Sequence, residues 1–103
     1  MGKQLRLKTS NHTYHITSRT NGQRLWVKAK RDKKAMCKIL KRVLRKHLVA
    51  LYKFICMDNH FHLLIRIDEG QDLSQLMCEF KTAYAKYFNS KYHRNGHFWG
   101  DRF

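Results

Sequence analysis

The sequence predicts an α+β domain in which two helices pack on one face of an antiparallel sheet. Strand-like and helix-like periods follow one another in the order strand, helix, strand, strand, helix along the 103 residues. The second and third strands are separated by Asp58 and Asn59 alone, and so short a turn favours an antiparallel hairpin. The chain has no proline, repeat or low-complexity segment, so we expect residues 1–103 to form a single domain.

The first half of the chain predicts one strand and one helix. Residues 12–20, HTYHITSRT, are rich in β-branched and aromatic side chains, which is typical of a strand, and Asn21-Gly22 then indicates a turn. From Lys33 onward, apolar residues recur every three or four positions and lysines and arginines fill the opposite face, which indicates an amphipathic helix. Its apolar stripe, expected in the core, consists of Met36, Ile39, Leu40, Val43, Leu44 and Leu48.

The second half predicts a hairpin and a second helix. The two strands of the hairpin are expected over residues 49–57 and 60–67. Asp72 is placed to cap the helix that follows, and Gln75 stands three residues later, as in a capping box. The apolar stripe of this helix consists of Leu73, Leu76, Met77, Phe80, Tyr84, Tyr87 and Phe88.

The charge of the chain predicts a polyanionic partner. Twenty-two Lys and Arg against seven Asp and Glu give a net charge of +15, and binding phosphates with such a domain releases counterions. The alternative is a basic face that serves only solubility. The three cysteines form no C-x-x-C pair. This speaks against a disulfide framework or a thiolate zinc site, and favours buried free thiols in a reducing cytosol.

Nothing in the sequence suggests export or insertion into a membrane. The first residues lack the apolar region of a signal peptide. The longest apolar runs are far shorter than the roughly 20 residues that a membrane-spanning helix needs. We therefore expect a cytoplasmic protein that has no membrane partner.

Two histidines open the third strand, and alternate residues of a strand point to the same face. His60 and His62 therefore share a face. The other face is wholly apolar and is expected to lie under the helices, which leaves the histidine face open. The apolar face consists of Phe61, Leu63, Ile65 and Ile67, and the open face of His60, His62, Leu64 and Arg66.

Two neutral imidazoles at positions i and i+2 are able to bind one divalent ion. Because no thiolate is near His60 and His62, Mg²⁺ or Mn²⁺ completed by phosphate and water is favoured, with zinc as the rival. The plain alternative is a pair of solvent-facing strand histidines, since H-x-H is a short and common pattern. The remaining histidines have no ligand spacing to the pair and are expected outside a metal site: His12, His15, His47, His93 and His97.

Three segments together resemble a known family. His60-Phe61-His62 follows Met57-Asp58-Asn59, HITSRTNG stands at residues 15–22, and LSQLMCEFKTAYAKYFNSKYHRNGHFWGDRF occupies residues 73–103. In this combination the chain resembles the single-tyrosine HUH transposases of single-strand insertion sequences, especially their REP-associated relatives. Each motif is weak alone, and the combination is specific.

The resemblance implies a ferredoxin-like or RRM-like sheet domain that binds single-stranded or hairpin DNA. It also implies a protein of bacterial type that associates with the nucleoid. It also implies Mg²⁺ or Mn²⁺ held by His60 and His62, and cleavage and rejoining of DNA strands during transposition through a phosphotyrosine link. The family contains monomers as well as homodimers, so the resemblance leaves the oligomeric state open.

The nucleophile of the family is a tyrosine on a later helix, which also carries a polar third metal ligand. The sequence ends at Phe103, so this tyrosine is expected after Phe103 and the catalytic residue stays unassigned. Tyr84 is the fallback. Its place in the apolar stripe of the second helix argues against it, because that stripe packs behind the sheet.

Contact with nucleic acid needs cations for phosphates and flat side chains for unstacked bases. Candidates of both kinds gather around the first turn and in the last third of the chain. Trp99 is either a base-stacking side chain or a core tryptophan, and the residues alone leave both open. The DNA-binding candidates are Arg19, Asn21, Arg24, Lys81, Lys86, Arg94, His97, Trp99 and Arg102.

A second function class fits the same sequence. The fold and the basic surface would serve equally well in a non-catalytic nucleic-acid-binding module, such as a domesticated remnant of a transposase. A ribosome-associated basic protein is a third class, but it would not need two histidines on an open strand face.

Overall fold

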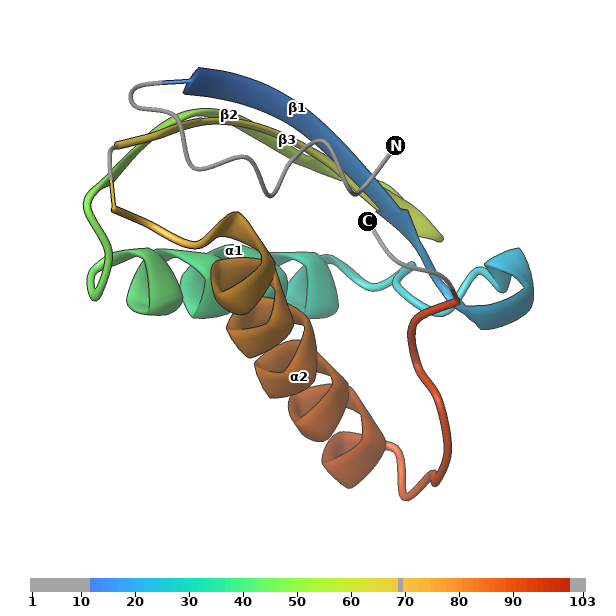
Figure 1. Ribbon diagram of the computed structural model, residues 1–103. Helices are drawn as coiled ribbons and strands as arrows, with labels where there is room; N and C mark the ends of the chain where they lie inside the picture. Colours follow the sequence, from blue (N-terminus) through green and yellow to red (C-terminus); the bar gives the residue numbers. More distant parts are fainter. Residues whose placement is uncertain (1–11, 69, 101–103) are drawn as a thin grey trace.

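The computed structural model describes residues 12–68 and 70–100 (Figure 1). Within these residues the chain forms strands and helices in the predicted order. The elements are β1 (His12–Arg19), a short 3-10 helix η2 (Asn21–Gln23), α1 (Lys30–Leu44), β2 (Val49–Cys56), β3 (His60–Ile67) and α2 (Leu73–Lys91). The predicted α+β class, with an antiparallel sheet and two helices, is confirmed.

The described sheet has the strand order β1-β3-β2, with both pairs antiparallel. The strand β3 is therefore central, and the hairpin partner β2 and the distant β1 flank it. Both helices lie on the same side of the curved sheet, and none of the described residues forms a helix on the opposite face (Figure 1). This arrangement gives β3 one covered face and one open face.

Burial along β3 alternates at every residue. Phe61, Leu63 and Ile65 are fully buried beneath the helices, while the intervening residues are partly exposed. The three buried side chains pack against the apolar stripes of both helices, including Leu40 of α1 and Phe80 of α2. The predicted assignment of the two faces of β3 is therefore confirmed.

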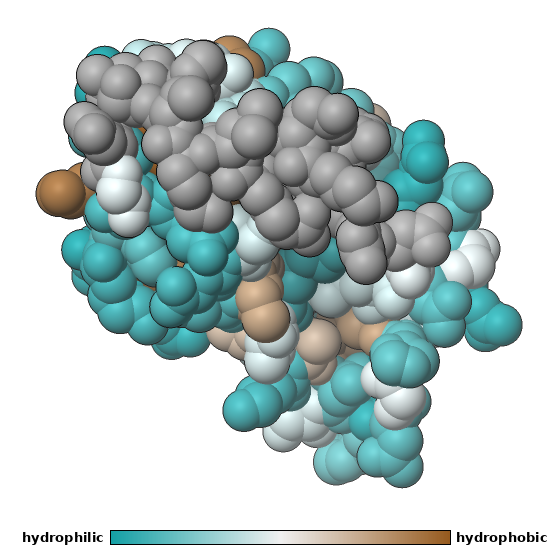
Figure 2. Space-filling view, viewed as in Figure 1, coloured by the Kyte–Doolittle hydropathy of each residue, from teal (hydrophilic) through white to brown (hydrophobic). Residues whose placement is uncertain are grey.

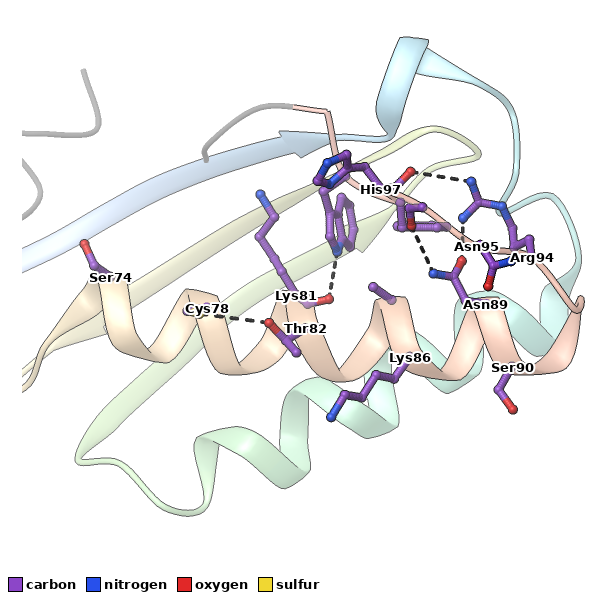
Figure 3. A pocket seen from close by; sticks show the side chains of 14 residues that line it. Ser74, Cys78, Lys81, Thr82, Lys86, Asn89, Ser90, Arg94, Asn95 and His97 are labelled. Atoms are coloured by element: carbon purple, nitrogen blue, oxygen red, sulfur yellow. Dashed lines mark hydrogen bonds between the residues drawn. The ribbon is translucent and has the colours of Figure 1, made fainter.

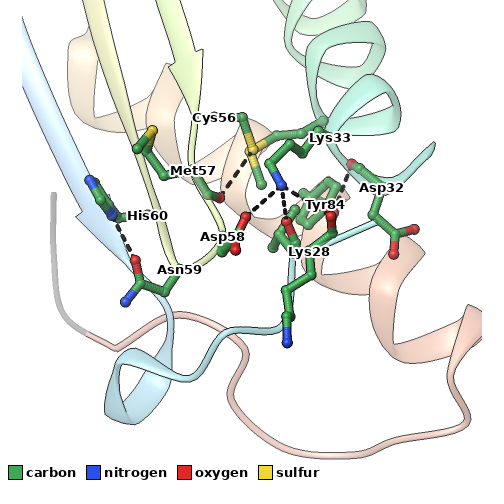
Figure 4. A network of polar contacts seen from close by, with 11 residues as sticks. Lys28, Asp32, Lys33, Cys56, Met57, Asp58, Asn59, His60 and Tyr84 are labelled. Carbon is green, nitrogen blue, oxygen red and sulfur yellow. Dashed lines mark hydrogen bonds and ion pairs between the residues drawn. The ribbon is translucent and has the colours of Figure 1, made fainter. Parts of the chain in front are cut away.

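The turn between β2 and β3 is the predicted two-residue hairpin. The Met57 N–H donates to the His60 carbonyl at 2.7 Å, which closes the turn. The Asp58 carboxylate pairs with the Lys33 ammonium group at 2.6 Å (Figure 4). Backbone N–H groups of the 20–27 segment also donate to the carbonyls of both turn residues. The turn that leads into the histidines is thus held by α1 and by the segment after β1.

The Asp72 carboxylate caps α2, as predicted, by accepting from the backbone N–H groups of Ser74 at 2.9 Å and Gln75 at 3.3 Å. The Gln75 side chain donates to the carboxylate of Glu79, one turn further along the helix, at 3.4 Å.

Two expectations about burial are wrong. The helix α1 ends at Leu44, so Leu48 leaves the predicted apolar stripe and is 67% exposed. The last turn tightens into hydrogen bonds between residues three apart, which directs the chain away from the core. Cys78 is exposed rather than buried because it lies off the apolar stripe of α2, and Cys37 and Cys56 are half-buried free thiols.

A buried carboxylate joins the start of α1 to the end of α2. Asp32 is 1% exposed and accepts hydrogen bonds from the Tyr87 hydroxyl at 2.7 Å, the Lys91 ammonium at 2.9 Å and the Tyr92 hydroxyl. The Tyr84 hydroxyl donates to the Asp32 carbonyl at 3.0 Å (Figure 4). Burial by itself would raise the pKa of Asp32, but the hydrogen bonds from Tyr92, Lys91 and Tyr87 outweigh it and lower the pKa.

We expect Asp32→Ala to lower the free energy of unfolding by about 3 kcal/mol, because an ammonium group and two hydroxyls lose their acceptor. The sign of the pH dependence follows from the lowered pKa. The stabilisation is fully present above the unfolded-state pKa of about 3.9 and is lost as the pH falls through the folded-state value. Urea unfolding between pH 2 and pH 7 measures both effects.

The matched control is Asp58→Asn, which removes a partly exposed ion pair and should change stability by about 1 kcal/mol or less. Asp32→Asn should flatten the loss of stability in acid, and Asp58→Asn should leave most of it. An equal effect of the two substitutions would contradict the central place given to Asp32.

Candidate metal centre and nucleic-acid interface

His60 and His62 lie side by side on the open face of β3. Their ring centroids are 4.9 Å apart and the ring planes meet at 85°. Both residues are partly exposed. The two rings are close enough for one ion to contact a nitrogen of each, and from here they are called the histidine pair.

Each ring of the histidine pair has a hydrogen-bond partner at Nδ1. His60 Nδ1 lies 2.8 Å from Asn59 Oδ1 (Figure 4). His62 Nδ1 lies 3.1 Å from the Thr17 hydroxyl oxygen on β1. Every hydrogen bond that the described residues make to these two rings is at Nδ1.

His15 lies against the histidine pair, although its spacing in the sequence shows no link to it. The β1–β3 register places Thr17 opposite His62, and His15 shares the face of Thr17. The His15 ring stacks on His62 at 5.3 Å, and its Nε2 is 3.3 Å from His62 Nδ1. Within the described part of the chain, no three His, Cys, Asp or Glu side chains are arranged to hold a metal ion together.

The surroundings of His60 favour its neutral form. Burial, the neighbouring His62 and the charge of Arg19, whose Cα is paired with that of His60, all lower the pKa of His60. A neutral imidazole offers a nitrogen lone pair to a metal ion. The ring arrangement, the neutral state and the occupied Nδ1 atoms together fit two ligands of a divalent ion whose other ligands come from outside the pair.

Five of the predicted DNA-binding residues line one groove of about 930 Å³ beside α2. The groove runs between α2 and the 94–99 segment, and Figure 3 shows side chains from both elements around it. Apolar side chains occupy the bottom of this hollow and hydrophilic ones surround it (Figure 2). The five residues are Lys81, Lys86, Arg94, His97 and Trp99.

Trp99 serves the core and the groove together. Its ring packs edge-to-face on Phe61 with centroids 5.4 Å apart, and it also contacts Phe98 at 4.8 Å. The indole N–H donates to the Lys81 carbonyl at 2.9 Å, and the Lys81 ammonium lies 5.3 Å from the ring centroid. Trp99 therefore packs against the core, and its base-stacking role stays a prediction.

The guanidinium group of Arg94 contacts other residues of the protein. The guanidinium lies 4.1 Å from the centroid of the Trp26 ring and donates to the Asn89 side chain. A second nitrogen donates to the His97 carbonyl at 3.5 Å. Arg94 therefore shapes the segment that forms one wall of the groove.

The segment that forms one wall of the groove is hydrogen-bonded to the end of β1. The Asn21 N–H donates to the Phe98 carbonyl at 2.8 Å, and the Gly100 N–H donates to the Arg19 carbonyl at 2.9 Å. A Cβ at position 100 would lie 3.0 Å from the Thr20 carbonyl oxygen, so glycine permits this close approach. Arg24, 5.8 Å from the Trp26 ring centroid, lies in the same turn region, and Arg102 is outside the described residues.

Three of the five tyrosines are bound on the helix side of the sheet, away from the histidine pair. The hydroxyls of Tyr84, Tyr87 and Tyr92 donate to Asp32 on the helix side of the sheet. Burial raises the pKa of Tyr84 and of Tyr87, which disfavours a tyrosinate at either position. Tyr14 packs against the core. Tyr52 lies at the irregularity of β2, between Leu51 and Lys53.

One known protein family and two solved structures are similar to this chain. The model of the family described as "Transposase IS200 like" matches residues 8–103. The structure of the REP-associated tyrosine transposase bound to a REP hairpin matches 94% of this chain and 56% of that chain, with 18% identity and a TM-score of 0.72. A transposase-like protein from Deinococcus radiodurans R1 matches 94% of this chain and 78% of its own, with 19% identity and a TM-score of 0.74.

At these identities the two structures show a shared fold. The chain spans just over half the length of the hairpin-bound transposase that it matches. A search of curated proteins finds no match.

Among the described residues, no helix is long and apolar enough to cross a membrane.

Trp99→Ala is expected to lower the free energy of unfolding by about 3 kcal/mol, since the ring leaves a cavity against Phe61 and Phe98. Trp99→Phe keeps most of the packing and loses the N–H bond to Lys81, so about 1 kcal/mol is expected. Thermal and urea unfolding of both variants measure this difference. A Trp99→Ala protein as stable as the wild type would show that the ring has no core role.

Proposed function

The chain belongs to the family of IS200-like transposases, and from that membership we propose that it is the DNA- and metal-binding core of a single-tyrosine transposase. Its substrate would be single-stranded or hairpin DNA, whose strands are cleaved and rejoined in transposition. The observation that carries this proposal is the histidine pair, held at both Nδ1 atoms on an open face beside Arg19. A solvent-facing pair would need no such support.

His60 and His62 would hold Mg²⁺ or Mn²⁺, which supplies Lewis-acid polarisation of the scissile phosphate when it is bound. Arg19 is paired across the sheet with His60 and contributes positive charge at the same place. This charge favours a phosphate near the pair at the step where negative charge builds on its oxygens. The described residues thus bind and orient the phosphate.

The proposed path of the DNA follows the basic residues. A single strand would lie in the groove, with Lys81 and Lys86 near its phosphates and the edge of Trp99 near a base. It would then cross the end of β1 at Asn21 and Arg24 and reach the histidine pair past Arg19. The hydrogen bonds between the 98–100 and 19–21 segments support this route, because they join one wall of the groove to the end of β1.

In the proposed reaction, a tyrosine oxygen bonds to the phosphorus while the bond from the phosphorus to the 3′ oxygen breaks. The hydroxyl hydrogen of the tyrosine passes to solvent, and the 3′ oxygen leaves as a hydroxyl with a proton from solvent. Rejoining reverses these steps. Tyr84, Tyr87 and Tyr92 are bound to Asp32 on the other side of the sheet. We therefore propose that the nucleophile comes from sequence after Phe103. The same sequence would supply the third, polar metal ligand.

A second candidate function is a non-catalytic DNA-binding module. It is favoured by one observation, that the hydroxyls of Tyr84, Tyr87 and Tyr92 are all bound to Asp32. The two candidates share the fold, the groove and DNA binding, and they differ in the metal and in the tyrosine. The experiments below separate them.

Mn²⁺ titrated into the protein is expected to broaden the imidazole resonances of His60 and His62 together. His60→Ala should weaken Mn²⁺ binding sharply because one of two protein ligands is lost. The matched control is His93→Ala, a histidine outside the pair. Broadening centred on His93 or His97, or unaffected rings at positions 60 and 62, would contradict the metal role and favour the non-catalytic module.

DNA binding is expected to weaken steeply with salt. If about six phosphates are bound, the slope of log K against log salt on single strands should be about −4. Replacing Lys81 and Lys86 together with alanine should reduce the slope by about 1.4, since two phosphate contacts are lost. The control replaces Lys38 and Lys41, exposed on α1, and should leave the slope unchanged. A slope near zero in the wild type would refute the electrostatic interface.

The 103-residue chain is expected to bind labelled hairpin DNA with Mn²⁺ present and to form no covalent adduct on a denaturing gel. The reason is that each of Tyr84, Tyr87 and Tyr92 is held on the far side of the sheet from the histidine pair. An adduct that disappears in Tyr84→Phe would contradict the placement of the nucleophile after Phe103. Extending the chain by the residues that follow in its gene is the positive arm.

A further inference from the structure

We propose that Asn59 and Thr17 are positioning residues that fix both histidines of the pair in the Nδ1–H form, so that both Nε2 lone pairs are free to meet one ligand. This inference rests on the proposed function for its metal, and it adds residues from the hairpin turn and from β1 to the site.

The tautomer of His60 follows from the two ends of the Asn59 amide. Asn59 Nδ2 donates to the Gln23 carbonyl at 3.1 Å. A carbonyl oxygen only accepts, so the amide nitrogen must face Gln23 and the amide oxygen must face His60. Asn59 Oδ1 is then an acceptor 2.8 Å from His60 Nδ1. The hydrogen between them belongs to His60 Nδ1, which leaves the lone pair of this neutral ring on Nε2.

The backbone holds Asn59 in place for this contact. Its carbonyl accepts from the Thr20 N–H at 2.9 Å. The adjacent Asp58 is bound to Lys33 of α1 at 2.6 Å. The turn therefore has fixed positions on both sides, and the amide of Asn59 has a fixed orientation. Such outer contacts set the orientation and basicity of a metal-binding imidazole.

Two neighbours converge on one nitrogen of His62. The Thr17 oxygen lies 3.1 Å and His15 Nε2 lies 3.3 Å from His62 Nδ1. In either form Nδ1 meets one of these neighbours, with its hydrogen when it is protonated and with its lone pair when it is bare. A hydrogen on His62 Nδ1 can be donated to the Thr17 oxygen, and only this form of the neutral ring leaves the Nε2 lone pair free for the metal of the proposed function.

The consequence is a preorganised pair. A free imidazole exchanges its hydrogen between the two nitrogens and rotates about its χ2 angle. Acceptors at both Nδ1 atoms remove the first freedom and restrict the second, so less ordering remains when a ligand binds. Loss of such an outer-shell partner typically lowers metal affinity by about 10- to 100-fold. His15 adds a stacked ring behind His62 that limits the same rotation.

The first measurement uses the metal-free protein. Long-range ¹H–¹⁵N correlation spectra distinguish a hydrogen-bearing ring nitrogen from a bare one in each histidine. At a pH where the rings are neutral, we expect His60 and His62 to show Nδ1–H and bare Nε2. Asn59→Ala and Thr17→Val should each convert the histidine that they touch to a mixture of tautomers. A wild-type spectrum with hydrogen on Nε2 of either ring would overturn the proposal for that ring.

The second measurement is Mn²⁺ affinity by calorimetry. Asn59→Ala and Thr17→Val are expected to bind Mn²⁺ about 10- to 100-fold more weakly than the wild type. Asn59→Asp and Thr17→Ser retain an acceptor oxygen and should recover most of the affinity. Asn59→Asp loses the bond to Gln23, as Asn59→Ala does, so a purely structural role of that bond would weaken both equally. Such an equal loss would overturn the positioning role.

The matched control is Thr13→Val, the same substitution on the same face of β1 but opposite Arg66. It should leave the tautomers and the Mn²⁺ affinity unchanged, and unchanged affinity in Thr17→Val as well would overturn the proposal for Thr17. A different outcome is possible, in which the wild-type protein carries hydrogen on Nδ1 of both rings but binds no Mn²⁺. It would refute the proposed metal role while supporting the tautomer assignment.

Discussion

The two helices bury alternate side chains of the central strand β3, and the placement of the histidines depends on this constraint. Phe61, Leu63 and Ile65 are fully buried. A slip of β3 by one residue would expose these three side chains and bury the imidazoles, so the core strongly specifies one register. The hydrophobic core is therefore what holds His60 and His62 on the open face, although neither histidine belongs to it.

The neighbours of β3 then decide what surrounds the imidazoles. The β1 register brings Thr17, His15 and Arg19 to the same open face from more than 40 residues away in the sequence. The hairpin turn supplies Asn59 from the adjacent position. Local and long-range contacts thus meet at one pair of rings, and both kinds act on Nδ1. The chemistry open to the pair is set by these neighbours as much as by the histidines.

The polar contacts of Asp32 organise the other side of the molecule. By accepting from Tyr87, Lys91 and Tyr92, this carboxylate joins the first turn of α1 to the end of α2. The same contacts hold these hydroxyls on the side of the sheet away from the histidines. The return of the chain along residues 94–100 packs Phe98 into the core and forms one wall of the groove beside α2. The end of α2 therefore takes part both in the contacts of Asp32 and in the proposed DNA-binding groove.

The local pattern of the sequence determined the order of strands and helices, the two faces of β3 and the exposure of the histidine pair, because these follow from periods of two and 3.6 residues. The pattern did not determine where each helix ends. Leu48 lies outside α1, since tertiary contacts rather than the period of the sequence decide where a helix stops. Only the tertiary structure decided that His15 and Thr17 touch His62, that Asp32 is buried under tyrosines, and that five basic and aromatic residues share a groove. These contacts join residues 45 or more positions apart or lie between elements. Strand register and helix packing create them, and neither is written in any short stretch of the chain.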